Sequence, residues 1–152
     1  MKPEQYFLRY AFPCAHILLE QNKITKEQYI EMKKAFYENA IVPREKLENT
    51  FKAAFRRLKA IKEDYWNVDA LRHYFVSYHN KCIDENEGDY AKFSEEFKED
   101  CKVKKYKILK KKGVIFIIDK NGTKTQVEGK MLPDAKEGEY IYVHLGVAVE
   151  IA

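Results

Sequence analysis

The sequence predicts an α+β protein in which an N-terminal all-α helical bundle is followed by a small β-barrel. Two observations predict this class. Helix caps and apolar residues at helical spacing fill the first hundred residues, whereas the remainder consists of β-branched runs separated by turn residues. A chain of 152 residues suffices for one ordinary domain or two small ones. We therefore expect a helical domain over 1–99 and a barrel domain over 100–152.

Helix signals begin at the first residues of the chain. Pro3 suits the first turn of a helix, and Thr25 with Gln28 forms a capping box that opens a second helix. Pro43 opens a third helix, whose apolar residues all fall on one face of a 3.6-residue period. These apolar residues are Leu47, Phe51, Ala54, Phe55, Leu58 and Ile61.

Two shorter helices are expected before the barrel. Asn67 or Asp69 can cap a helix that runs through Tyr78, and Asp89 can cap one that contains Phe97. The aromatic residues of these helices belong to the expected core, because large apolar side chains at helical spacing are usually buried.

Strand signals follow one another closely after residue 100. The β-branched run 114–118 is a strand, and Asn121-Gly122 is a strong hairpin signal that returns the chain along 123–127. Further strands are expected over 103–109, 140–144 and 147–149. Four or five short strands in about fifty residues fit a small OB-like barrel.

Positive charge is concentrated in the expected barrel. Residues 1–100 carry 17 basic and 18 acidic side chains, whereas residues 101–152 carry 11 and 6. No apolar run approaches the roughly 18 residues that span a bilayer, and no signal-type apolar core follows Met1. We therefore expect a cytoplasmic protein without a membrane partner, whose three cysteines are reduced.

The last part of the chain resembles the small hydrogenase-formation chaperones called HypC, HybG or HupF. Gly138-Glu-Tyr-Ile-Tyr-Val-His144-Leu-Gly146-Val-Ala148 is similar to their segment Gly-Asp-Tyr-Val-x-Val-His-x-Gly-Phe-Ala. Met131-Leu-Pro-Asp134 lies where many members carry Leu-x-Pro-Asp. Cys101 precedes Ile118-Asp119 by the interval that separates the family's essential cysteine from its Val-Asp, and Gly113 is also in register. The resemblance covers about a third of the chain.

The resemblance implies a fold, a cargo and partners. Members of the family are OB-like barrels that work with a partner protein, HypD. They hold iron while it acquires cyanide and carbon monoxide, and then deliver it to the large subunit of a nickel–iron hydrogenase. Carried over residue by residue, the metal-contacting cysteine is Cys101 and the nearby histidine is His144. In this chain the cysteine is internal, and Lys105 and Tyr106 replace the family's Pro-Gly.

The chemistry of these two residues is compatible with a metal. A thiolate is the metal-binding form of cysteine, and its pKa falls from about 8.5 when positive charge is near. Lys102, Lys104 and Lys105 follow Cys101 directly, and a neutral imidazole of His144 suits iron as readily as zinc. The alternative is an ordinary thiol at a domain junction and a strand histidine bonded to backbone.

A second set of metal ligands lies in the helical region. His79 and Cys82 are three residues apart and share a helix face, whereas Cys14 and His16 converge only if Pro13 breaks its helix. A structural zinc site built from all four has suitable ligand types, but it lacks the paired spacing of a zinc finger. Buried thiols and surface or capping histidines are the alternative.

Lysine dominates the first expected strand. Its basic residues are Lys102, Lys104, Lys105, Lys107, Lys110, Lys111 and Lys112, with Tyr106 between them. Basic and aromatic side chains on an OB-like barrel form a platform for single-stranded nucleic acid. The alternatives are an edge strand whose lysines prevent sheet-to-sheet aggregation, and a surface for an acidic protein partner.

Motifs for independent catalysis are not evident. The chain has no phosphate-binding glycine loop, nucleophile elbow or Ser-His-Asp order. We therefore expect a non-catalytic accessory that holds or delivers iron. The alternatives are a nucleic-acid-binding protein and a protein-interaction module that has lost the metal role.

Overall fold

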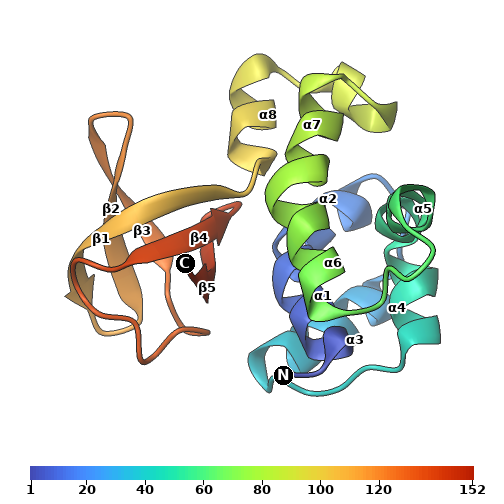
Figure 1. The fold of residues 1–152 in the computed structure, drawn as a ribbon, viewed down its shortest axis with the longest axis horizontal. Helices are drawn as coiled ribbons and strands as arrows, with labels where there is room; N and C mark the ends of the chain where they lie inside the picture. The colour runs from blue at the N-terminus through green and yellow to red at the C-terminus, as the bar shows by residue number, and fades with distance from the viewer. The chain divides into compact units, whose positions relative to one another are not determined.

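The protein is α+β, with its helices N-terminal to a closed five-stranded barrel, as the sequence predicts (Figure 1). The computed structural model describes residues 1–152. The chain forms two compact units, Met1–Tyr78 and His79–Ala152. None of its helices combines the length and apolar character needed to cross a bilayer.

The first unit is helical and has an aromatic core. Its helices are α1 (Pro3–Ala11), α2 (Ala15–Glu20), α3 (Lys26–Tyr37), α4 (Arg44–Thr50), α5 (Lys52–Ile61) and α6 (Val68–His73), and the last continues into a π-helical turn, Tyr74–Tyr78. The fully buried Phe7 ring contacts Phe55 and Trp66 at centroid distances of 4.9 and 5.6 Å. Such aromatic pairs stabilise a core beyond the area that they bury.

Two of the predicted helix caps are confirmed in this unit. The Gln28 N–H donates to Thr25 Oγ1 at 3.1 Å, and the Thr25 N–H donates to Gln28 Oε1 at 2.9 Å, which completes the capping box. The Asn67 side chain accepts a hydrogen bond from the Ala70 N–H at 2.9 Å. Each cap satisfies a backbone donor that a helix start leaves unpaired.

The helix expected from Pro43 to Ile61 is instead two helices, because Phe51 leaves the helical conformation with φ −108° and ψ 57°. At the end of α4, the Thr50 hydroxyl donates to the Lys46 carbonyl at 2.9 Å. Hydrogen bonds of this kind bend helices. Both helices still bury part of the predicted apolar face, namely Leu47 in α4 and Phe55 and Leu58 in α5.

The second unit contains two helices and the barrel. The helices are α7 (His79–Asp84) and α8 (Glu95–Cys101), with a 3₁₀ turn, Gly88–Lys92, between them. Asp89 lies in that turn and does not cap a longer helix; Ser94 caps α8 by accepting from the Phe97 N–H at 3.1 Å. The hydroxyl of Ser94 is placed for this bond because its backbone is extended.

The barrel strands run β1 (Lys104–Lys112), β2 (Ile115–Lys120), β3 (Thr123–Glu128), β4 (Tyr140–His144) and β5 (Val147–Ile151). Their order around the barrel is β1-β2-β3-β5-β4, and β1 also pairs with β4, so the sheet closes. The predicted hairpin is present, with Asn121 and Gly122 both at positive φ. The strand pattern of the sequence is therefore confirmed.

Phe116 fills the centre of the barrel. It is fully buried, and a Cβ built on Gly129 would lie 2.4 Å from its ring. Glycine at position 129 is therefore a requirement of the aromatic core. Around the ring pack Ile108, Ile118, Val127, Leu132, Ala135, Ile141, Val143 and Ala148.

Candidate functional site

The start of β1 is held by one side chain from α7. The Asn80 amide donates to the Val103 carbonyl at 2.7 Å, and the Val103 N–H donates to Asn80 Oδ1 at 2.8 Å. The side chain thus satisfies both backbone groups of a buried residue, as a neighbouring strand would. This pair of bonds fixes the chain two residues after Cys101.

Strand register brings the two predicted metal ligands to the same end of the barrel. Lys104 of β1 lies opposite Val143 of β4 in an antiparallel pair. Cys101, the last residue of α8, is three residues before Lys104, and His144 directly follows Val143. Antiparallel pairing therefore places the approach to β1 beside the end of β4. Both residues are buried, at 3% and 1% exposure.

A second histidine lies against His144. The rings of His79 and His144 have centroids 5.2 Å apart and meet edge to face. His79 is itself buried, and its Nε2 is 3.4 Å from the Tyr90 hydroxyl. This contact could not be predicted from the sequence, because 65 positions separate the two histidines and only tertiary packing brings them together.

The second predicted set of ligands is divided between the two units. Cys14 and His16 belong to Met1–Tyr78, whereas His79 and Cys82 belong to His79–Ala152. Burial raises the pKa of the Cys14 thiol to about 11, and its Sγ donates to the Ala11 carbonyl at 3.1 Å. No group of three or more His, Cys, Asp or Glu side chains is arranged to hold a metal ion.

The lysines nearest Cys101 are paired with carboxylates. Lys102 Nζ lies 2.5 Å from both Asp84 and Glu99, and Lys104 forms a further ion pair with Glu99. Lys105 is exposed. The positive charge expected beside Cys101 is therefore largely compensated by acidic residues of α7 and α8.

Glu99 should titrate far below an ordinary glutamate. Hydrogen bonds from Lys102 and then Lys104 lower the pKa of Glu99 to about 2, from an ordinary value of 4.5. Because the folded-state pKa is lowered, the stabilisation from this cluster is complete above about pH 4.5 and is lost as the pH falls towards 2. Carboxyl-resolved NMR should give a midpoint near 2 at low salt for the wild type. In a Lys102→Met, Lys104→Met variant the midpoint should return towards 4.5. An unchanged midpoint would contradict the assigned cause.

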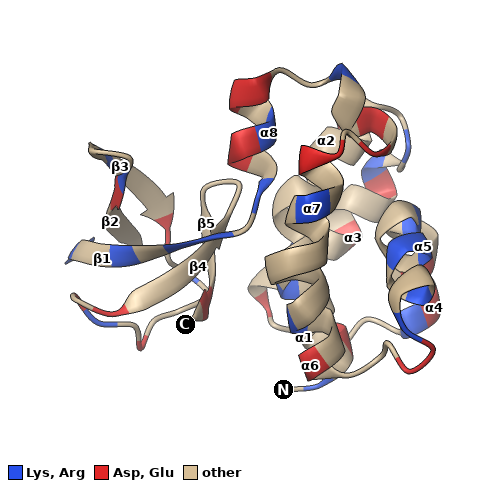
Figure 2. Cartoon of the chain, turned by 45° about the horizontal axis from the view of Figure 1, so that its top comes forward, with Lys and Arg blue, Asp and Glu red and all other residues tan.

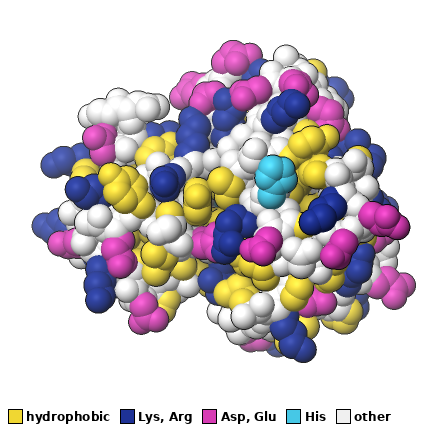
Figure 3. Space-filling model, viewed as in Figure 1, with side chains coloured by type: hydrophobic (Ala, Val, Ile, Leu, Met, Phe, Trp, Pro, Cys, Tyr) yellow, Lys and Arg dark blue, Asp and Glu magenta, His cyan; other side chains and the backbone are white.

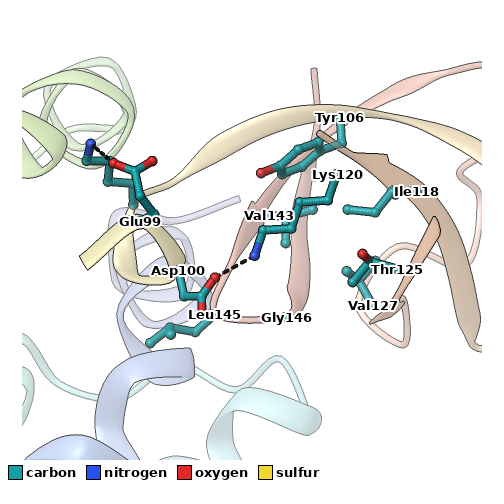
Figure 4. A pocket seen from close by; sticks show the side chains of 11 residues that line it. Glu99, Asp100, Tyr106, Ile118, Lys120, Thr125, Val127, Val143, Leu145 and Gly146 are labelled. Carbon is teal, nitrogen blue, oxygen red and sulfur yellow. Dashed lines mark hydrogen bonds and ion pairs between the residues drawn. The ribbon is translucent and has the colours of Figure 1, made fainter. Parts of the chain in front are cut away.

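A pocket of about 280 Å³ opens at the same end of the barrel (Figure 4). Its apolar lining comes from inward-facing strand residues, including Ile118, Val127 and Val143. On its rim Lys120 forms an ion pair with Asp100 at 2.5 Å, and this hydrogen bond raises the pKa of Lys120. The pocket is further lined by Glu99, Lys102, Tyr106, Thr125, Leu145 and Gly146.

The lysine-rich strand is not an edge strand. β1 pairs with β2 on one side and with β4 on the other, so its lysines do not protect a free sheet edge. That alternative is wrong because the sheet closes into a barrel. Tyr106, expected among the basic residues of the binding platform, packs against the barrel core and lines the pocket.

No family model matches the chain, and no curated protein matches it.

Proposed function

We propose that the chain is a non-catalytic accessory protein that holds iron through the Cys101 thiolate, with His144 assisting, and passes it to a partner. The observation that carries this proposal is the register of β1 with β4, which brings these two residues to one end of the barrel. A thiolate and a neutral imidazole are ligands that iron accepts. Iron is then the cargo of the protein, as it is the cargo of the hydrogenase-formation chaperones that the sequence resembles.

The strand order supports the OB-like assignment on which the resemblance depends. The closed order β1-β2-β3-β5-β4, with β3 and β5 parallel, supports a small five-stranded barrel of the OB-like kind. Within the similar segment, Gly138 and Gly146 are required at positive φ, and Ile141 and Val143 fill the core. His144 differs from these residues, because a buried imidazole adds a metal-binding group that barrel packing does not require.

The proposed site is shared with a partner. Cys101 and His144 supply two ligands, so the remaining positions around iron must be filled by a partner protein or by small ligands such as cyanide and carbon monoxide. Such an incomplete set leaves positions open for a partner or for small ligands, whereas a structural metal site is closed by four protein ligands. By resemblance, the partners are a maturation protein of the HypD kind and the large subunit of a nickel–iron hydrogenase.

The full chain should acquire iron when it is produced with hydrogenase-maturation proteins. We expect anaerobically purified protein to carry iron in a fixed ratio, with infrared bands in the cyanide and carbonyl region. The same chain produced alone is the control for these bands. Folded protein that carries neither iron nor bands after co-production would refute the proposal and favour a protein-interaction module.

A further inference from the structure

The lysines of β1 fall into two groups that point to different sides of the barrel wall. Lys104 and Lys111 lie on the same side as the buried Ile108; Lys104 pairs with Glu99, and Lys111 donates to the Pro133 and Ala135 carbonyls at 2.6 and 2.9 Å. A bulge between Ile108 and Lys110 shifts the alternation of the strand. The lysines on the other side, which we call the outer lysines, are Lys105, Lys107, Lys110 and Lys112.

The outer lysines are exposed and form no ion pairs. Their cross-strand partners are Tyr142, Tyr140, Ile117 and Ile115, so no carboxylate faces any of them across the sheet. Basic segments recur along β1 in Figure 2, and in Figure 3 basic side chains stand beside hydrophobic ones over the barrel. Four like charges on one strand repel one another, and the closed barrel gives them no protective role.

An exposed tyrosine ring and a half-buried one accompany this charge. Tyr140 is 51% exposed, and the Lys105 ammonium lies 5.8 Å from its ring centroid. Tyr142 lies opposite Lys105 on the same outer surface. A tyrosine ring in such a position offers a flat face on which a base can stack, while the neighbouring ammonium groups contact phosphates.

From these observations we propose that the outer lysines, with Tyr140 and Tyr142, bind single-stranded nucleic acid. Lys105 and Lys107, and likewise Lys110 and Lys112, are about 7 Å apart, since a strand rises about 3.3 Å per residue. A row of charges at this spacing suits a linear polyanion. The exposed ring of Tyr140 favours a single strand over a duplex, because only unpaired bases present free faces. This activity is independent of the proposed iron site.

The test measures binding of the full chain to a fluorescent oligothymidylate as salt is varied. If all four outer lysines contact phosphates, the slope of log K against log salt is about −2.8, and affinity falls about 50-fold between 50 and 200 mM salt. The Lys105→Gln, Lys107→Gln, Lys110→Gln, Lys112→Gln variant should lose most of this binding and slope. Tyr140→Leu should weaken binding at least about fivefold at constant salt.

A matched control separates the surface from net charge. Lys26, Lys33, Lys34 and Lys52 are exposed in the helical unit, and their replacement by glutamine removes the same charge. This variant should bind as the wild type does. Equal loss in both quadruple variants would overturn the proposal. Tighter binding of a duplex, or of polyglutamate, would also overturn it, the latter pointing to an acidic protein partner.

Discussion

Cys101→Ala should abolish iron retention by the full chain when it is produced with hydrogenase-maturation proteins. The iron content per protein should fall from a fixed ratio in the wild type to background. A metal held by only two side chains of this protein loses its one anionic ligand when the thiol is removed, and imidazole alone does not replace it. Iron content and the cyanide and carbonyl infrared bands are measured together after anaerobic purification, so that loss of cargo and loss of its ligands are both seen.

Cys14→Ala is the control for the number of thiols. Cys14 lies in the other compact unit, and its raised pKa keeps it protonated at neutral pH. The Cys14→Ala variant should therefore leave the iron content unchanged. Because Cys101 is buried, circular dichroism of both variants must match the wild type for the comparison to count. Iron retained by folded Cys101→Ala would show that this thiol is not the ligand.

Much of the fold could be predicted because its signals are local. The Thr25 capping box, the Asn121-Gly122 turn and the alternation of the strands each depend on neighbours within a few residues, and the structure contains all three. The break at Phe51 was missed, because an apolar stripe remains on one face whether or not the helix is interrupted. The hydrogen bond from the Thr50 hydroxyl to the preceding turn does not change the spacing of apolar residues, so the spacing does not reveal it.

The candidate site depends more on long-range packing. Cys101 and His144 are candidates by resemblance, and the register of β1 with β4 brings the segments that carry them to the same end of the barrel. His79 of α7 contacts His144 of β4. Rules of residue spacing apply within one helix or strand, so they do not predict a contact between residues 65 positions apart. Barrel closure is also a long-range property. Because the barrel closes, the lysine-rich strand β1 has a neighbouring strand on both sides and is not the edge strand that was one expectation.

Asn80 offers a test of how the site is positioned. Asn80→Ala removes both hydrogen bonds to Val103 and leaves a buried N–H and a buried carbonyl without these partners. Each unsatisfied buried group costs about 1–3 kcal/mol, so we expect about 2–6 kcal/mol of destabilisation in the second unit. Hydrogen exchange read by mass spectrometry should show faster exchange in β1 and β4, with the helices of Met1–Tyr78 unchanged. Asn49→Ala, at an exposed position, should change stability by less than about 0.5 kcal/mol.

Asn80→Asp distinguishes the hydrogen bonds from packing. An ionised aspartate can accept from the Val103 N–H, but its second oxygen faces the Val103 carbonyl, whereas a protonated aspartate can donate to that carbonyl. The folded state therefore favours the protonated form, the aspartate pKa rises on folding, and stability relative to the wild type increases as the pH falls. A difference in β1 exchange between Asn80→Asp and wild type that does not change with pH would contradict this role. If the prediction holds, α7 sets the position of the β1 entry, and through it the distance between Cys101 and His144.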